Sequence, residues 1–279
     1  MDRVAVLAQA MLAGRMGTFP NILSSEGTHL VETTQGAPFR MVTTGSGLVI
    51  SICPELVDWS SQNLSSLSYG EAFEARWIAA IQNAVKEYAG GTLWGPDQVF
   101  LSTHQQYDIP DSPVNRSFRL VIVTGAELSQ YLRLDLFETG LQNLRANSVF
   151  NIGFVDREPI GVCGGTPTPQ GLLSLHLEVS PAWQSRGIGT WLARHALNTF
   201  PGRGYHVYCR CGLSNLKAIR LCHRLGLRLG WLELVGKRDA PASAHPAENA
   251  ADLESLLRQN PWVRPADDPP QNNGRSRGA

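Results

Sequence analysis

Apolar and polar residues follow one another in the first part of the chain with the periods of both strands and helices. Phe39 to Thr43 and Leu48 to Cys53 are rich in β-branched and apolar residues, and Thr44 to Gly47 between them is typical of a hairpin turn. From Gly70 to Tyr88 apolar residues recur every three or four positions, which predicts an amphipathic helix ending at Gly90. The first part is therefore predicted to be α+β.

Three further features complete the first part. The apolar segment from Met1 to Gly14 predicts a short N-terminal helix, because Asp2 and Arg15 do not fit the basic start and long apolar core of a secretory signal. A short strand is expected from Val99 to Thr103. The segment Asp108 to Asn115 contains Pro110 and Pro113, which is typical of a linker.

From Phe118 the pattern becomes regular and predicts the order β-α-β-β-β-α-β-α-β, a mixed sheet with helices on both faces. A hairpin is expected around Asp156, Arg157 and Glu158. The expected strands are Phe118 to Thr124, Val149 to Val155, Pro159 to Gly164, Leu172 to Val179, His206 to Cys211 and Leu227 to Val235. The expected helices are Glu127 to Arg145, Gly187 to Phe200 and Asn215 to Leu225.

These patterns divide the chain into three parts. Residues 1–114 are expected to form a smaller α+β domain, and residues 116–238 a second domain of the α/β class with a mixed sheet. Residues 239–279 are rich in Pro, Ala and Asn, so we expect a tail that is disordered in part and holds at most one short helix.

Composition limits the classes of protein that fit. The chain has 279 residues, enough for two domains, and only 17% of them are charged. Lys plus Arg and Asp plus Glu both number 24, which removes a global argument for binding nucleic acid or a membrane surface. No apolar run is long enough to span a bilayer. The five cysteines form no Cys-x-x-Cys motif, and we expect buried thiols in a reducing compartment.

The balanced net charge hides an asymmetry between the two predicted domains. Residues 1–114 hold 5 Lys/Arg and 11 Asp/Glu, whereas residues 115–238 hold 15 and 7. A basic half beside an acidic half suggests either that the basic half binds an anionic partner or that the halves attract each other. Charge alone leaves both interpretations open.

The segment with the most chemical information joins the strand ending at Val179 to the helix that follows. Pro181 begins a turn, and Gly187 and Gly189 open an amphipathic helix. The first turn of a helix has unpaired N–H groups and the positive end of the helix dipole, so it favours anions. A glycine there leaves the backbone accessible to a phosphate.

Two motifs in this half resemble those of the GNAT superfamily of acyl-CoA-dependent N-acetyltransferases. The segment Gln184-Ser-Arg-Gly-Ile-Gly189 fits the pyrophosphate signature Gln/Arg-x-x-Gly-x-Gly/Ala, and Val179-Ser-Pro181 fits the residues before it. Downstream, Asn215-Leu-Lys-Ala218 and Leu225-Gly-Leu227 resemble the family's Asn-x-x-Ala helix and its Leu-Gly-Phe end. The resemblance covers about residues 116–238, and it implies a GNAT-like acyltransferase domain preceded by the smaller α+β domain.

The resemblance also implies roles for individual residues. The backbone of Leu177 and Val179 would pair with the pantetheine arm of acetyl-CoA where two strands diverge, and Asn215 would bind pantetheine or help to set its helix. Arginines of this half would contact CoA phosphates, with Arg186, Arg194 and Arg220 as the candidates. The residues implied to bind the cofactor are Leu177, Val179, Gln184, Ser185, Arg186, Gly187, Ile188, Gly189, Thr190 and Asn215.

The catalytic residues of the family are only partly matched. The family's proton donor is usually a Tyr seven residues after the Asn, and Cys222 stands there. Cys222 is expected either to assist the leaving thiolate or to be a core residue. The positions where the family's general base usually lies hold Leu173 and Leu175. Glu178 or His176, on the other face of the strand, is expected to act as the base only if a bulge shifts the register. The alternative is that the amine loses its proton to water.

The sequence thus predicts an enzyme that transfers an acetyl group from acetyl-CoA to an amine by direct attack in a ternary complex. The expected partners are acetyl-CoA and a small-molecule amine rather than a protein, with no nucleic acid and no membrane. No metal is expected, because Cys209 and Cys211 lack further ligands at suitable spacing, and the expected location is the cytoplasm. The alternatives are a silent acyl-CoA-binding sensor and an interaction module.

Overall fold

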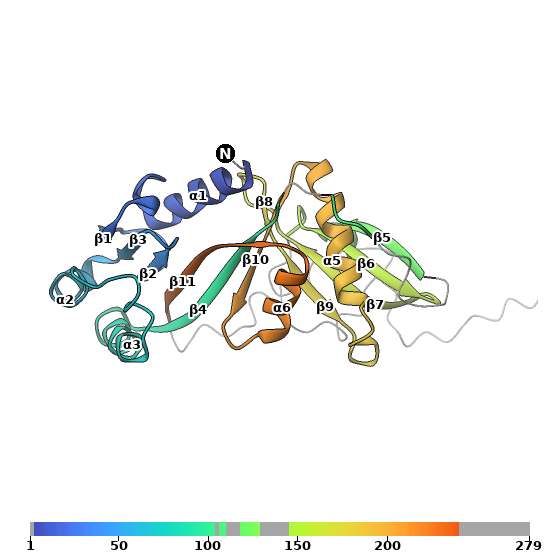
Figure 1. Cartoon of the computed structure of the whole chain (residues 1–279). Helices are drawn as coiled ribbons and strands as arrows, with labels where there is room; N and C mark the ends of the chain where they lie inside the picture. The colour runs from blue at the N-terminus through green and yellow to red at the C-terminus, as the bar shows by residue number, and fades with distance from the viewer. Residues whose placement is uncertain (1–2, 104–105, 110–117, 129–144, 240–279) are drawn as a thin grey trace, which may run out of the picture. The chain divides into compact units, whose positions relative to one another are not determined.

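The computed structural model describes residues 3–103, 106–109, 118–128 and 145–239 (Figure 1). Its first element is helix α1, Arg3–Met16, which confirms the expected N-terminal helix. No helix among these residues is long and apolar enough to cross a membrane. The tail expected from residue 239 lies outside the described residues, apart from Asp239 itself.

Sheet A has seven strands in the order β1-β3-β2-β11-β4-β10-β8. Its two faces are covered by different helices: α1 contacts β3, β4 and β8, whereas α3 and α6 contact strands from the other side. The strands are β1 Gly27–Glu32, β2 Phe39–Thr43, β3 Gly47–Ile52, β4 Gly91–Leu101, β8 Leu172–Ser174, β10 His206–Gly212 and β11 Arg228–Arg238. The helices of this region are α2 Val57–Asn63, α3 Ala75–Ala89 and α6 Leu216–Arg224, with short 3-10 turns at Ile22–Ser24 and Pro54–Leu56.

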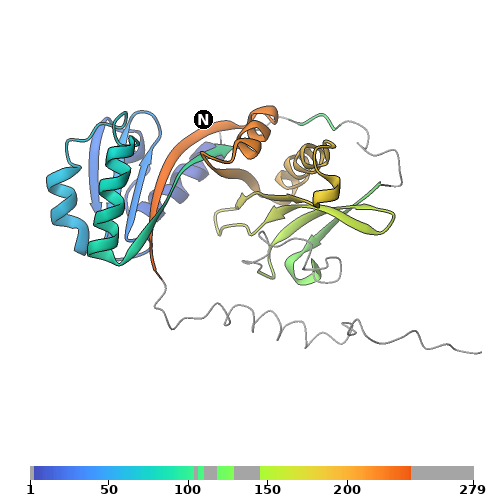
Figure 2. The same cartoon turned by 90° about the horizontal axis from the view of Figure 1, so that it is seen from below.

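Sheet B has four strands in the order β5-β6-β7-β9, and all neighbours in it are antiparallel. Helices α5 and α4 lie on opposite sides of this sheet (Figure 2). The elements are β5 Phe118–Thr124, β6 Val149–Val155, β7 Glu158–Gly165, β9 His176–Val179, α4 Gly125–Leu128 and α5 Ile188–Thr199, with 3-10 turns at Pro181–Trp183 and Pro201–Arg203. The expected hairpin is present, and Asp156 and Arg157 at its tip both have positive φ.

The segment predicted as one strand, Leu172 to Val179, is two strands in different sheets. Leu172–Ser174 pairs with β10 in sheet A, and His176–Val179 pairs with β7 in sheet B. Leu175 lies at the change, and its N–H donates to the carbonyl of Tyr208 at 2.8 Å. The side chains keep alternating through the break, which is why the sequence pattern gave no sign of it.

Two other predictions of the first part needed correction. Strand β4 begins at Gly91, eight residues before the predicted start at Val99. The added part of the strand contains Gly95 and Pro96, which lie opposite a register irregularity of β11, where a proline is tolerated. Strand β1 and helix α2 were not predicted, and helix α3 begins at Ala75 rather than near Gly70.

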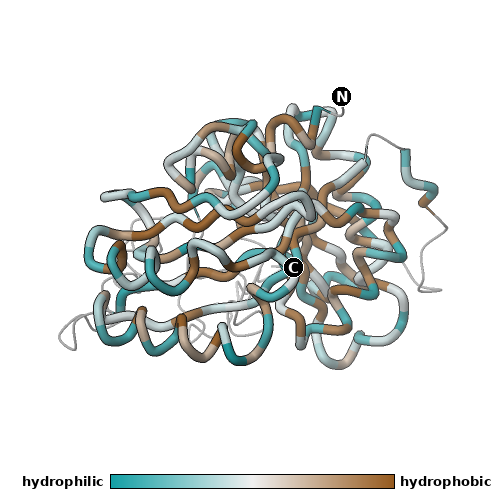
Figure 3. Tube along the Cα trace, turned by 60° about the vertical axis from the view of Figure 1, so that its left-hand side comes forward, coloured by the Kyte–Doolittle hydropathy of each residue, from teal (hydrophilic) through white to brown (hydrophobic). Residues whose placement is uncertain are grey.

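Strand β11 joins the two halves of the sequence, because it pairs antiparallel with β2 on one side and with β4 on the other. Apolar positions recur along the inner segments of the chain, and many of the outer turns are hydrophilic (Figure 3). The proposed domain limit near residue 114 stays a prediction, since residues 110–117 are not described. The expected helix Glu127 to Arg145 also lies mostly outside the described residues. Its start is described and is covered by α4, Gly125–Leu128.

Candidate functional site

The candidate site lies where β9 and β10 part. The last residue pair between β8 and β10 is Ser174 with Tyr208, and among the described residues β9 pairs only with β7. The N–H of Ser180 donates to Ile160 of β7 at 2.9 Å, so by alternation the backbone groups of Leu177 and Val179 point the other way, toward β10. These are the two residues expected to pair with an extended ligand.

A tight loop follows β9 and leads into α5. Ser185 has φ 62° and Gly187, the residue that caps α5, has φ 82°. The first intrahelical bond runs from the Trp191 N–H to the Gly187 carbonyl at 3.0 Å, so the N–H groups of Ile188, Gly189 and Thr190 precede the helical ladder. Gln184 through Gly187 are exposed, and the loop can therefore be reached by an anion.

Gly189 keeps the space between α5 and β9 open. A Cβ atom on Gly189 would lie 3.4 Å from a Leu177 methyl and 3.6 Å from a Val179 methyl, which are ordinary contacts. A larger side chain would extend over the strand that is expected to face the pantetheine arm. The side chain of Gln184 donates to the carbonyl of Val179 at 3.0 Å and thus ties the loop to the end of the strand.

The three arginines expected to contact phosphates differ in their surroundings. Arg186 is exposed and lies 5.0 Å from the centre of the Trp183 ring, a cation–π contact beside the loop. Arg194 donates from Nη1 to the carbonyl of Asp108 at 3.2 Å. Arg220 is exposed on α6.

Asn215 caps helix α6, since its side chain accepts from the Ala218 N–H at 3.1 Å. This bond satisfies one of the free N–H groups at the start of the helix. The expectation that Asn215 helps to set its helix agrees with this geometry, and its contact with pantetheine stays a prediction.

Cys222 lies in a cluster of three buried thiols with Cys209 and Cys211 of β10. The sulfur atoms of Cys211 and Cys222 are 3.7 Å apart. Hydrogen bonding to Cys209 and burial raise the pKa of the Cys222 thiol to about 12, although the bond to Cys211 acts in the opposite direction. The bond to Cys222 and burial also raise the pKa of Cys211. Both groups are therefore neutral thiols at pH 7, able to donate hydrogen bonds but poor nucleophiles.

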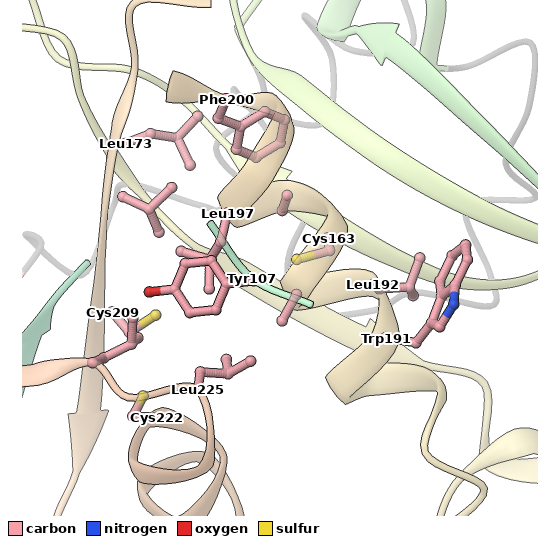
Figure 4. Packing of buried hydrophobic residues seen from close by; sticks show 14 of the residues in the cluster. Tyr107, Cys163, Leu173, Trp191, Leu192, Leu197, Phe200, Cys209, Cys222 and Leu225 are labelled. Carbon is pink, nitrogen blue, oxygen red and sulfur yellow. The ribbon is translucent and has the colours of Figure 1, made fainter. Parts of the chain in front are cut away.

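Sequence reasoning missed Tyr107, which is 7% exposed and packs in the same cluster. Its backbone is held twice by the Asn198 side chain of α5, through the N–H at 2.8 Å and the carbonyl at 2.7 Å. Figure 4 shows the Tyr107 ring between Leu197 and Cys209, beside the cluster that holds Cys222. Its hydroxyl is 3.4 Å from that of Thr103. No local motif marks this tyrosine, because the fold brings it to α5 from a distant segment.

His176 and Glu178 lie on the face of β9 opposite α5. Glu178 pairs across strands with Val162, a member of the apolar cluster on the far side of sheet B from α5. The His176 Nε2 and Glu178 Oε2 atoms are 3.5 Å apart, and the two side chains are 34% and 24% exposed. The pairing of β9 with β7 shows no shift of register, so the bulge expected to bring Glu178 or His176 to the acceptor is not found there. The strand instead changes sheets at Leu175, and this change parts β9 from β10. Within the described ranges no group of three or more potential metal ligands occurs.

A strand that leaves its neighbour, followed by an exposed glycine loop at a helix start, is an arrangement with room and N–H donors for an extended anionic ligand. A sequence family described as Acetyltransferase (GNAT) family matches residues 120–227. Residues 120–227 are thus similar to a GNAT acetyltransferase domain, and the match spans less than half of the chain. No curated protein matches the sequence.

Solved structures are matched as well, and those described below are matched at low identity. A GCN5-related N-acetyltransferase of Kribbella flavida is 14% identical, with a TM-score of 0.49, and the match covers 86% of this chain and 97% of that one. A GCN5-related N-acetyltransferase-like protein of Streptococcus suis is 10% identical, with a TM-score of 0.46 and coverages of 83% and 98%. A Salmonella typhimurium protein assigned as an acetyltransferase, solved with its cofactor acetyl-CoA, is 16% identical, with a TM-score of 0.32 and coverages of 46% and 98%.

Proposed function

We propose that the protein is an N-acetyltransferase that moves the acetyl group of acetyl-CoA to the amine of a small molecule in the cytoplasm, without a covalent enzyme intermediate. The observation that carries this proposal is the parting of β9 from β10 next to the exposed loop at the start of α5. In this proposal the N–H groups from Ser185 to Thr190 bind the pyrophosphate. The backbone groups of Leu177 and Val179 that point toward β10 pair with the pantetheine arm, next to the bond that the Val179 carbonyl accepts from Gln184.

The reaction needs two proton movements and no metal. The amine nitrogen attacks the thioester carbonyl carbon, a C–N bond forms, and the C–S bond breaks as CoA leaves as a thiolate. The attacking nitrogen loses one proton, which Glu178 accepts in this proposal, with His176 3.5 Å away as its neighbour. The departing sulfur gains one proton from a donor on the side of α5 and α6, the face opposite to the one that holds Glu178.

Two groups can assist the departing sulfur: a thiol of the cluster, and the tyrosine that packs beside it. Cys222 occupies the position of the family's tyrosine, and its raised pKa suits a hydrogen-bond donor better than a group that gives up its proton. The Tyr107 hydroxyl is the second candidate because the ring packs in the same cluster. We assign stabilisation of the thiolate to Cys222 and proton donation to Tyr107.

The test combines binding and turnover. Isothermal titration with acetyl-CoA measures cofactor binding, and release of free CoA thiol over a panel of amines measures transfer. Glu178→Gln is expected to lower kcat by roughly 10²- to 10⁴-fold, and Tyr107→Phe by roughly 10²-fold, with acetyl-CoA affinity unchanged. Arg76→Gln on α3, whose guanidinium pairs with Glu74 at 2.9 Å, is the control. Unchanged rates in both site variants would refute the assigned roles.

A silent acyl-CoA sensor is the second candidate function. What favours it is that Cys222, at the usual position of the proton donor, is a buried thiol with a pKa raised to about 12. A sensor would bind acetyl-CoA in the titration and release no thiol with any amine. An interaction module, the third reading of the sequence, would not bind acetyl-CoA.

A further inference from the structure

Strand β1 lies at one end of sheet A and, among the residues that the structure describes, pairs with β3 only (Figure 1). The residues of β1 are half-buried or exposed, whereas all six residues of its neighbour β3 are buried. The strand at the other end of the sheet, β8, has only three residues. The six residues of β1 therefore form the long outer edge of this sheet.

The outer edge of β1 presents backbone groups for a further strand. The N–H of Thr33, directly after β1, donates to the carbonyl of Ile52 at 2.8 Å, so this part of the backbone points toward β3. In a parallel pair, alternate residues point both of their backbone groups to the same side. The N–H and carbonyl groups of Thr28, Leu30 and Glu32 therefore point away from β3.

Strand β1 lacks the features that usually protect an edge strand from association. It contains no Lys and no Pro, and its register with β3 runs without a bulge. Leu30 packs against the cluster under α3 and Val31 against the cluster under α1, and both side chains remain partly exposed. Hollows of the surface lie at both ends of the strand. An edge that is apolar on both faces and accessible at its ends is suited to strand addition.

We propose that β1 pairs antiparallel with β1 of a second copy of this chain, so that the two copies of sheet A become one continuous sheet. The outward backbone groups of both strands must meet, and this places Leu30 of one protomer opposite Leu30 of its partner, on a two-fold axis. In this register Thr28 lies opposite Glu32, and His29 lies opposite Val31. Apolar side chains meet at the centre, and no two like charges are directly opposite.

The register centred on Leu30 is favoured over its neighbour. A pairing of equal length centred on His29 also brings the outward groups together, but it places Glu32 of one protomer opposite Glu26 of its partner. Carboxylates directly opposite each other repel. The strand is thus complementary to itself in the register centred on Leu30, which favours a second copy over a different protein as the occupant of this edge.

The first experiment measures the mass of the full chain by light scattering over a dilution series. We expect a species of twice the 30.5 kDa of one chain at the higher concentrations. The two-fold axis brings together two N-terminal halves, each with 5 Lys/Arg and 11 Asp/Glu in residues 1–114, so added salt should strengthen the dimer. A monomer at every concentration would overturn the proposal. So would a dimer that salt weakens, which contact between an acidic half and a basic half predicts.

The second experiment tests the register by oxidation with diamide. Leu30→Cys places two thiols opposite each other in a hydrogen-bonded pair, with Cα atoms about 5.5 Å apart, a distance that a disulfide spans. In Val31→Cys the two thiols lie diagonally, about 7–8 Å apart, and should link far less. The native cysteines are buried, and the wild type gives the background of linked dimer. Equal linking in both variants, or linking in neither, would overturn the pairing.

The third experiment disrupts the edge without touching the bonds to β3. Leu30→Lys puts two positive charges on the axis and should raise the dissociation constant of the dimer about 10-fold or more. Glu32→Pro removes one outward N–H from each protomer and should raise it about 10-fold. Leu229→Lys on β11, at a side chain that is 54% exposed, is the control and should remain dimeric. A wild-type dissociation constant in either edge variant, with the melting temperature unchanged, would overturn the proposal.

Discussion

The two faces of strand β10 have opposite chemistry. Val207, Cys209 and Cys211 point toward α5 and α6 and are buried among apolar residues and thiols. Tyr208 and Arg210 point to the α1 side, where the apolar cluster gives way to four charged residues that pair with one another, Arg40, Asp97, Arg210 and Glu233. A single strand therefore separates an apolar face lined by thiols from a charged face, and the period of two in its sequence is enough to do so.

The two faces are also stabilised differently. The thiol face gains from removal of apolar surface from water. The thiols of Cys211 and Cys222 remain uncharged because hydrogen bonds within the cluster, together with burial, raise their pKa values. On the charged face, desolvation disfavours charge and lowers the pKa of Arg40, so stability there depends on each carboxylate having its guanidinium. Substitutions on the charged face should accordingly cost more stability than substitutions on the thiol face.

The largest effect on stability is expected for Glu233→Gln. Glu233 is 1% exposed, and its loss leaves the buried Arg40 guanidinium without its partner at 2.9 Å. Removing one member of a buried pair costs about 3–5 kcal/mol, measured as the free energy of unfolding in urea. Glu74→Gln on exposed α3 is the matched control and should cost about 0–1 kcal/mol. A loss below about 1 kcal/mol for Glu233→Gln would contradict the contrast between the faces.

The next effect is on binding at the thiol face. Gly189→Val should weaken acetyl-CoA binding by about 100-fold or more, which is about 2.7 kcal/mol, because the larger side chain extends over Leu177 and Val179. The fold should survive, since a Cβ there makes only ordinary contacts. Gly202→Val, where a Cβ would meet nothing within 4 Å, is the control. Isothermal titration with acetyl-CoA measures the affinity of both folded variants. An unchanged affinity in Gly189→Val would show that the loop does not bind acetyl-CoA.

A smaller effect is expected for Cys222→Ala. The variant removes one buried sulfur and should cost about 1 kcal/mol of unfolding free energy, with kcat reduced only severalfold. Its kcat and melting temperature should be compared with those of Tyr107→Phe. A loss of about 10²-fold in kcat for Cys222→Ala, with acetyl-CoA affinity unchanged, would make Cys222 the proton donor instead.

The smallest effect concerns pH. Burial lowers the pKa of His195, whose ring lies 3.8 Å from that of Trp191. A lowered pKa means that the unfolded chain takes up a proton at a higher pH than the folded chain. The contribution of His195 to stability is therefore complete above its ordinary value of about 6.5 and declines as the pH falls through the lowered folded value. Melting temperatures from pH 8 to pH 5 should fall less steeply in His195→Phe than in the wild type, and equal slopes would argue against this effect.

Local patterns in the sequence were sufficient to predict most strands and helices from Phe118 onward and the loop around Gly187 and Gly189. They failed where the outcome depends on distant partners. The alternation from Leu172 to Val179 runs unbroken across a change of sheet, and Tyr107 is fixed by Asn198, which is 91 residues away in the sequence. Arg210, Asp97 and Glu233 come from three separate segments, so no spacing along the chain connects them.

The position of β11 between β2 and β4 has a consequence for synthesis on the ribosome. The two earlier strands emerge long before Arg228–Arg238, and until then each lacks its neighbour in the centre of sheet A. Contacts between strands so far apart in the sequence form slowly. Until they form, the unpaired edges of β2 and β4 are exposed and can associate with other chains. A nascent chain arrested before residue 228 should therefore require chaperones, and release of the final strand should complete the sheet.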